Sequence, residues 1–182
     1  AYIPGYFSSY LDKSKLPNFT LLVSRNNQIA HLSSQGLASV EDKTQLRYDS
    51  IYRIFSMTKP ITSTAIMMLY ERGLLRLEHE VSRYLPEFKN IKVWDGGDIE
   101  NYRVRDPSQP ILIRDLLTHT SGMTYGFMLG HPVIKLYNTS GLASAKNPKT
   151  KEEMGLDEFS NTASSLPLTF DPGSKWLSLI HI

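Results

Sequence analysis

The first forty residues carry two kinds of hydrophobic pattern. Between residues 2 and 11, tyrosines recur every fourth position with other apolar residues beside them, which is the spacing of one helix face. Residues 19–24 and 28–33 are runs of β-prone residues, and Asn26 and Asn27 lie between them, where asparagine tolerates the positive φ of a tight turn. The pattern therefore predicts a packing helix followed by a β-hairpin.

A second apolar helix is predicted over residues 60–72, directly after a short approach segment at 50–55. Four of its residues follow the i, i+4, i+7, i+8 spacing, two more widen the apolar arc, and Gly73 can end the helix: Ile61, Ala65, Met68, Leu69, then Ile66 and Met67. Because apolar residues cover so much of its circumference, this helix is expected to be mostly buried.

The remaining chain predicts shorter elements. We expect a helical stretch at 81–85 that Pro86 ends, a loop from Trp94 to Pro110, a helix at 111–117 with Gly122 just past its end, and a solvated loop at 139–153. The pattern shows neither an internal repeat nor a linker that divides the chain into two domains.

Composition limits the classes of protein. The chain has 182 residues, enough for one ordinary domain, and its 20 Lys+Arg against 18 Asp+Glu form no basic stripe, so no nucleic-acid partner is expected. It has no cysteine, which excludes disulfides, thiolate zinc sites and cysteine nucleophiles. No apolar run approaches the roughly 18 residues of a membrane span, so a soluble chain is expected. Neither its compartment nor its oligomeric state can be read from these features.

The strongest candidate for chemistry is Ser56 followed three residues later by Lys59, at the front of the apolar helix. Residues three apart on a helix share a face, so the hydroxyl can come within hydrogen-bond reach of the amine. If burial favours the neutral amine, Lys59 can take the serine proton, and the helix N-terminus favours the developing oxyanion. This arrangement would be a serine nucleophile that works without histidine.

A purely structural interpretation of the same pair stays open. Ser56 would then be an N-cap and Lys59 a surface residue of the first turn. Pro60 also disfavours helical φ and ψ at Lys59, so the shared face is not secured by the sequence.

Other candidate residues have plainer interpretations. His119 could partner a serine, but a histidine at a helix end more often caps carbonyls. Asp95 and Asp98 flank two glycines and could contact a cation, but calcium needs several more oxygen ligands, so we interpret both as loop residues. The α/β-hydrolase elbow, the zinc-protease motif, phosphate-binding glycine loops and the Rossmann fingerprint are all missing. The sequence therefore predicts no cofactor and no metal site.

Three segments resemble the serine β-lactamase and DD-peptidase superfamily, and most closely class C β-lactamases and family VIII carboxylesterases. The first is YRIFSMTKPIT at 52–62 with MLYERG at 68–73, the second is VSRYLPEF at 81–88, and the third is IRDLLTHTSG at 113–122. The resemblance implies an α+β, β-lactamase/transpeptidase-like fold, with an antiparallel sheet flanked by helices and a mostly helical lobe. It also implies that Ser56 attacks a carbonyl to form an acyl-enzyme, that Lys59 activates it, and that Thr118 to Gly122 belongs to the scaffold.

The sequence departs from this family near its end. A PGSKWL segment at 172–177 matches the one that precedes the family's Tyr-x-Asn motif, but Ser178 stands where the tyrosine is expected, and the Lys-Thr-Gly or His-x-Gly motif is absent. We therefore expect an incomplete β-lactamase-like domain over 1–182, truncated to about the first half of a longer parent. Residues 1–75 would begin the α/β lobe and residues 76–182 would form part of the helical lobe.

The functional expectation is a serine hydrolase acting on an ester, a β-lactam or a D-amino amide, with a small-molecule acyl substrate as its only expected partner. The fragment itself is expected to be inactive or nearly so, because the last strands and the second oxyanion donor are missing. The alternative is a non-catalytic, penicillin-binding-like module or scaffold in which Ser56 is only a cap.

Overall fold

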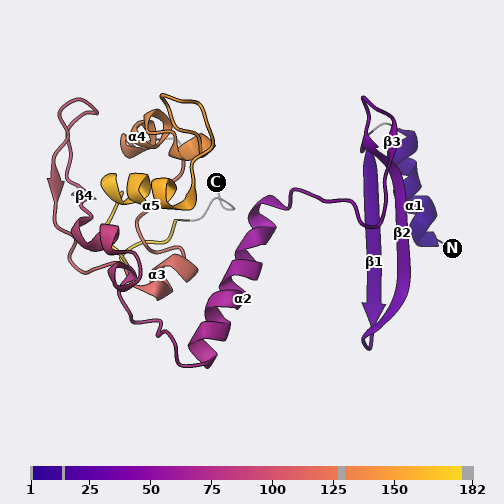
Figure 1. Ribbon diagram of the computed structural model, residues 1–182, viewed down its shortest axis with the longest axis horizontal. Helices are drawn as coiled ribbons and strands as arrows, with labels where there is room; N and C mark the ends of the chain where they lie inside the picture. Colours follow the sequence, from indigo (N-terminus) through magenta and orange to yellow (C-terminus); the bar gives the residue numbers. More distant parts are fainter. Residues whose placement is uncertain (1, 14, 127–129, 178–182) are drawn as a thin grey trace. The chain divides into compact units, whose positions relative to one another are not determined.

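The computed structural model describes residues 2–13, 15–126 and 130–177 (Figure 1). Contacts divide the chain into two compact units, residues 1–58 and residues 59–182. The division falls inside the segment that carries Ser56 and Lys59. Each unit is described separately below.

The first unit consists of one helix and a small antiparallel sheet. Helix α1 spans Tyr2–Asp12, and the sheet has the order β1-β2-β3, with bounds Asn18–Arg25, Gln28–Ser39 and Thr44–Gln45. The helix contacts the sheet through the ring of Phe7, 5.4 Å from that of Phe19, and through Ser8, whose hydroxyl donates to Gln35 Oε1 at 2.6 Å. The predicted N-terminal helix is therefore confirmed.

The β1–β2 turn has the geometry that its two asparagines favour. Asn26 and Asn27 have φ of 51° and 59°, the left-handed values that a two-residue hairpin turn requires. The predicted hairpin is confirmed, and its strands pair from Asn18 with Gly36 to Arg25 with Gln28. Among the residues of this unit whose burial the structure describes, none is buried, as expected for a hairpin that packs on a single helix.

The second unit is mostly helical, with short elements joined by ordered loops. After α2 its elements in chain order are η2, η3, β4, β5, α3, α4, η4 and α5. Their bounds are α2 Thr58–Glu71, η2 Val81–Arg83, η3 Pro86–Asn90, β4 Val93–Trp94, β5 Val104–Arg105, α3 Ile113–Leu117, α4 Val133–Thr139, η4 Leu142–Ser144 and α5 Leu156–Ser165.

Among the residues whose burial the structure describes, the core side chains all belong to the second unit. Its buried apolar side chains come from almost every element there, and Leu168, Val93 and Val133 are the most completely enclosed large ones. Leu168 is also tied by its backbone, since its N–H donates to the Lys92 carbonyl at 2.8 Å and its carbonyl accepts from Trp94 N–H at 2.9 Å. This extended pairing joins the segment around Leu168 to β4.

The prediction that the second helix is mostly buried is wrong. Helix α2 forms close to the predicted positions and ends before Gly73, whose φ of 69° suits a helix stop, but none of its residues is buried. Ile61 is 63% exposed and Met68 is 47% exposed. The apolar residues face several directions, and Ile66 is the one that packs against the core cluster, so one narrow stripe is covered and the rest is not.

Several boundaries also differ from the sequence pattern. The predicted loop at 94–110 contains the β4–β5 hairpin, in which the rings of Trp94 and Tyr102 stack at 5.2 Å. The helix expected at 111–117 begins two residues later, and Pro86 begins the 3₁₀ helix η3 instead of only ending the previous turn. The predicted surface loop at 139–153 includes η4, whose Leu142 is buried, and helix α5 was not expected at all.

Candidate active site

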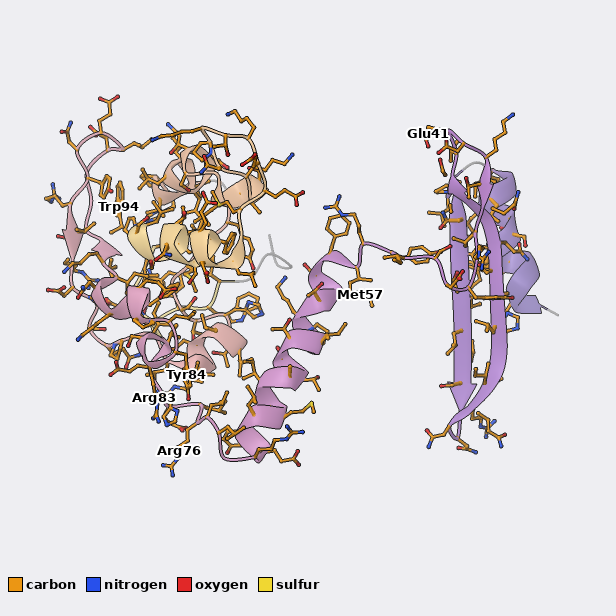
Figure 2. The ribbon with its side chains drawn as sticks, in the orientation of Figure 1. Glu41, Met57, Arg76, Arg83, Tyr84 and Trp94 are labelled. Atoms are coloured by element: carbon orange, nitrogen blue, oxygen red, sulfur yellow. The ribbon has the colours of Figure 1, made fainter. Side chains whose placement is uncertain are left out.

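Ser56 lies in a 3₁₀ turn immediately before helix α2. The turn η1 spans Phe55–Met57, and it is closed by Met57 N–H, which donates to the Ile54 carbonyl at 3.0 Å. Figure 2 shows Met57 at the start of α2, which begins at Thr58. Ser56 is exposed and stands two residues ahead of the helix, so the helix begins later than the N-cap interpretation of Ser56 requires.

Lys59 is the second residue of α2 and is also exposed. It has helical conformation although Pro60 follows it, because proline in the first helical turn sacrifices no hydrogen bond. The sequence argument made the role of Lys59 conditional on its burial, and no residue of α2 is buried. The positive end of the α2 dipole is nevertheless at this position, where it favours a developing negative charge.

The third family-like segment is built around a buried carboxylate. Asp115 is 3% exposed, and its Oδ2 accepts the Leu112 N–H at 2.9 Å while its Oδ1 accepts the Thr120 hydroxyl at 3.0 Å. The Thr120 N–H donates to the Asp115 carbonyl at 2.8 Å. These bonds fix the start of α3 and the turn that follows it, which is the role of a scaffold and not of a reacting group.

The PGSKWL segment at 172–177 is anchored to this scaffold. Gly173 N–H donates to the Thr120 carbonyl at 2.8 Å, and Leu177 N–H donates to the His119 carbonyl at 2.9 Å. Pro172 is fully buried, and its carbonyl accepts from Gln109 Nε2 at 2.7 Å. Ser178, where the sequence expects the family's tyrosine, lies outside the described residues.

A bidentate ion pair secures the same segment at Asp171. Arg105 Nη1 and Nη2 donate to Asp171 Oδ1 and Oδ2 at 2.9 Å and 2.5 Å, and Ser108 N–H donates to Oδ1 at 2.8 Å. The hydrogen bonds from Arg105, followed by the one from Ser108, hold the pKa of Asp171 well below its usual value. No local sequence pattern indicates this pair, because its partners are 66 positions apart.

The structure places two of the other candidates in turns. His119 has a left-handed backbone, with φ of 60°, and contacts Leu177 through its carbonyl. The carboxylate of Asp98 accepts the N–H groups of Glu100 and Asn101 at 3.0 and 2.8 Å, which is a loop-closing turn. Within the part of the chain that the structure describes, no three histidine or acidic side chains gather closely enough to hold a metal ion.

The second unit has a cavity of about 820 Å³ that sequence reasoning missed. Its walls come from two segments, the loop between β4 and β5 and the region around α4: Gly97, Asp98, Ile99, Glu100, Gly126, Gly130, His131, Pro132, Ile134, Lys135 and Asn138. Burial, with a smaller contribution from Lys175, lowers the pKa of His131 in this wall. The lining residues follow no sequence motif, so only folding brings them together.

Comparison with known proteins matches almost the whole chain to one family. A family model described as Beta-lactamase covers residues 4–179. The esterase EstB of Burkholderia gladioli is 33% identical over 177 residues, which are 97% of this chain and 41% of that protein. The chain thus spans about two fifths of the length of this relative.

Solved structures agree with the sequence match. The unliganded simvastatin synthase LovD from Aspergillus terreus has a TM-score of 0.72 and 30% identity, over 95% of this chain and 43% of that one. EstCE1, described as a hydrolase with promiscuous acyltransferase activity, has a TM-score of 0.74 and 25% identity, over 96% of this chain and 42% of that one. The fold is therefore α+β and β-lactamase/transpeptidase-like, as the sequence predicted. Among the described residues, the structure has no helix of the length and apolarity that crossing a membrane requires.

Proposed function

The chain belongs to the beta-lactamase family, and on that premise we propose that the whole protein is a serine enzyme that transfers acyl groups through Ser56. The observation that carries the proposal is local. An exposed serine precedes the N-terminus of α2 by two residues, and an exposed lysine follows three positions later in the first turn of that helix. A nucleophile, a base and a partial positive charge are thereby close together in the sequence.

The proposed reaction has two steps. We propose that groups elsewhere in the full-length protein enclose Lys59 and favour its neutral amine. The Oγ of Ser56 then attacks the acyl carbonyl while Lys59 takes the hydroxyl proton, and the bond from the acyl carbon to the leaving oxygen breaks. The proton passes from Lys59 to the departing alcohol. In the second step, water or another alcohol attacks the acyl carbon and gives its proton to Lys59, the bond between Oγ and the acyl carbon breaks, and Lys59 passes that proton to Oγ of Ser56.

Esters are the substrate class that the comparisons support best. EstB is named an esterase, and EstCE1 is described as a hydrolase that also transfers acyl groups. The names of these relatives thus include both hydrolysis and acyl transfer, and we propose a small acyl ester as the donor for either outcome. β-Lactams and D-amino amides are the other acyl donors that the same chemistry would accept.

The 182-residue chain is proposed to form an incomplete β-lactamase-like domain, with the α/β lobe beginning in residues 1–75 and the helical lobe in residues 76–182. It spans about two fifths of the length of EstB, so the groups that complete the reaction in a full-length protein are proposed to lie elsewhere in that protein. Little turnover is therefore expected from the chain by itself.

Steady-state hydrolysis of a nitrophenyl ester by the full-length protein tests the proposal. In Ser56→Ala we expect kcat to fall by about 10³-fold or more, because the nucleophile is gone. In Lys59→Gln we expect a fall of about 10²- to 10⁴-fold, the usual contribution of a general base.

Two matched variants control for effects on folding. Ser63→Ala removes a hydroxyl from the same helix, and Lys89→Gln removes an exposed ammonium group from η3, so both should retain wild-type kcat. Full turnover by Ser56→Ala would refute the assignment of the nucleophile. If the wild-type protein itself neither turns over nor becomes acylated, the non-catalytic module is the correct interpretation.

A further inference from the structure

Phe55, the residue immediately before Ser56, has an unusual backbone conformation. Its φ is +44°, in the left-handed region that side chains with a Cβ atom rarely adopt. At Asn26 and Asn27 positive φ is unremarkable, since asparagine tolerates it in a turn. For a bulky aromatic residue the same conformation is an outlier, and outliers of this kind concentrate at functional sites.

Packing of the Phe55 side chain does not explain the conformation. The ring is 73% exposed, so hydrophobic burial offsets little of the backbone cost. The contact described for it is with Arg53, whose guanidinium carbon lies 5.0 Å from the ring centroid. A cation–π contact at so exposed a position is weak. The reason for the strained backbone therefore lies in what it does to the neighbouring residues.

The neighbours form a tight turn that depends on this conformation. Ile54 has φ of −88° and ψ of −1°, Phe55 then takes its positive φ, and Met57 N–H returns to the Ile54 carbonyl at 3.0 Å. Phe55 and Ser56 are the two residues inside this closed turn, and α2 begins at Thr58, directly after Met57. If residue 55 left the left-handed region, the turn would open and Ser56 would move relative to the start of α2.

We propose that Phe55 is a positioning residue whose left-handed backbone holds Ser56 at the N-terminus of α2 for acylation. The inference rests on the proposed function of Ser56 and extends it to the residue that presents the nucleophile. Phe55 is proposed to act through its backbone conformation. The test must therefore vary how well residue 55 tolerates positive φ, and not merely the size of its side chain.

Three substitutions in the full-length protein separate these effects. Phe55→Gly and Phe55→Asn allow positive φ, and both should keep kcat for a nitrophenyl ester within about threefold of wild type. Phe55→Val introduces a β-branched residue that resists positive φ, and kcat should fall by about 5- to 30-fold, with KM changed less than about twofold. Tyr48→Val, an exposed aromatic-to-valine change without positive φ, should behave as wild type.

A stability measurement tests the strain without relying on catalysis. Because the Phe55 ring is largely exposed, Phe55→Asn loses little packing and relieves the backbone, so it should melt at a higher temperature than wild type. A lower melting temperature would overturn the inference, even if Phe55→Val does not fold.

The kinetic outcomes distinguish this inference from the function on which it rests. If the wild-type protein is acylated at Ser56 and Phe55→Val is acylated equally fast, the positioning role is wrong and the proposed function stands. If the wild-type protein is not acylated at Ser56, the proposed function fails and the positioning role fails with it.

Discussion

Replacing Gly122 with alanine should destabilise the second unit far more than the same change at Gly73. Both glycines have positive φ, 86° and 69°, so an alanine at either site incurs a left-handed backbone cost of about 1–2 kcal/mol. The reduced freedom of the unfolded chain returns about 0.4–1 kcal/mol at both sites. The two variants therefore share a net loss of about 0–1.5 kcal/mol.

The difference between the two sites is steric. A Cβ at Gly73 would meet nothing within 4 Å, whereas a Cβ at Gly122 would lie 2.3 Å from the Phe170 carbonyl oxygen. Relieving that clash moves the segment around Phe170 away, and with it the Thr169 N–H and hydroxyl, which donate to the Gly122 carbonyl at 2.8 and 2.9 Å. Losing two bonds of about 0.5–1.5 kcal/mol each gives an additional loss of about 1–3 kcal/mol.

Urea unfolding followed by tryptophan fluorescence measures this difference, because Trp94 and Trp176 both belong to the second unit. The unfolding midpoint of Gly122→Ala should be clearly lower than that of Gly73→Ala at an unchanged m-value. Equal midpoints would mean that the chain at Phe170 does not approach Gly122 in solution, and the account of the scaffold around Asp115 and Gly122 would be wrong.

Two further predictions concern the same unit. Leu168→Ala, at a fully enclosed position, should lower the free energy of unfolding by about 2–5 kcal/mol. Leu156→Ala, at an 89% exposed position, should change it by less than about 0.5 kcal/mol. Similar losses for the two variants in urea titrations would contradict the described core. Because Arg105 lowers the pKa of Asp171, the carboxylate contributes stability above the unfolded-state pKa of about 3.9, and this contribution is lost as the pH falls below that value. The melting temperature of wild type should then decrease more steeply below about pH 4 than that of Asp171→Asn, and parallel pH profiles would show that the ion pair contributes nothing.

Local sequence patterns predicted the elements that local forces determine. The two asparagines between β1 and β2 favour their turn by themselves, and Gly73 ends α2 because glycine accepts the left-handed stop. The Ser56–Lys59 pair was found in the same way, since its spacing and its position before a helix are both local features. The family resemblance then supplied the fold, which the comparisons confirm.

Features that depend on distant contacts were missed. The β4–β5 strands are two residues each, too short for an alternating pattern, and the ion pair between Arg105 and Asp171 joins positions 66 apart. The prediction that α2 is mostly buried was wrong for a related reason. An apolar pattern shows which residues can be covered but not what covers them. The strain at Phe55 could not be predicted either, since phenylalanine has no preference for positive φ.

The central claim is that Ser56 is the acylated nucleophile, and peptide mapping by mass spectrometry tests it most directly. The full-length protein would be incubated with a slowly released acyl ester or a penicillin, quenched in acid and digested. The account predicts an added acyl mass on the peptide that contains Ser56, and no such mass in the Ser56→Ala variant. An adduct on a different residue, or an adduct that persists in Ser56→Ala, would contradict it.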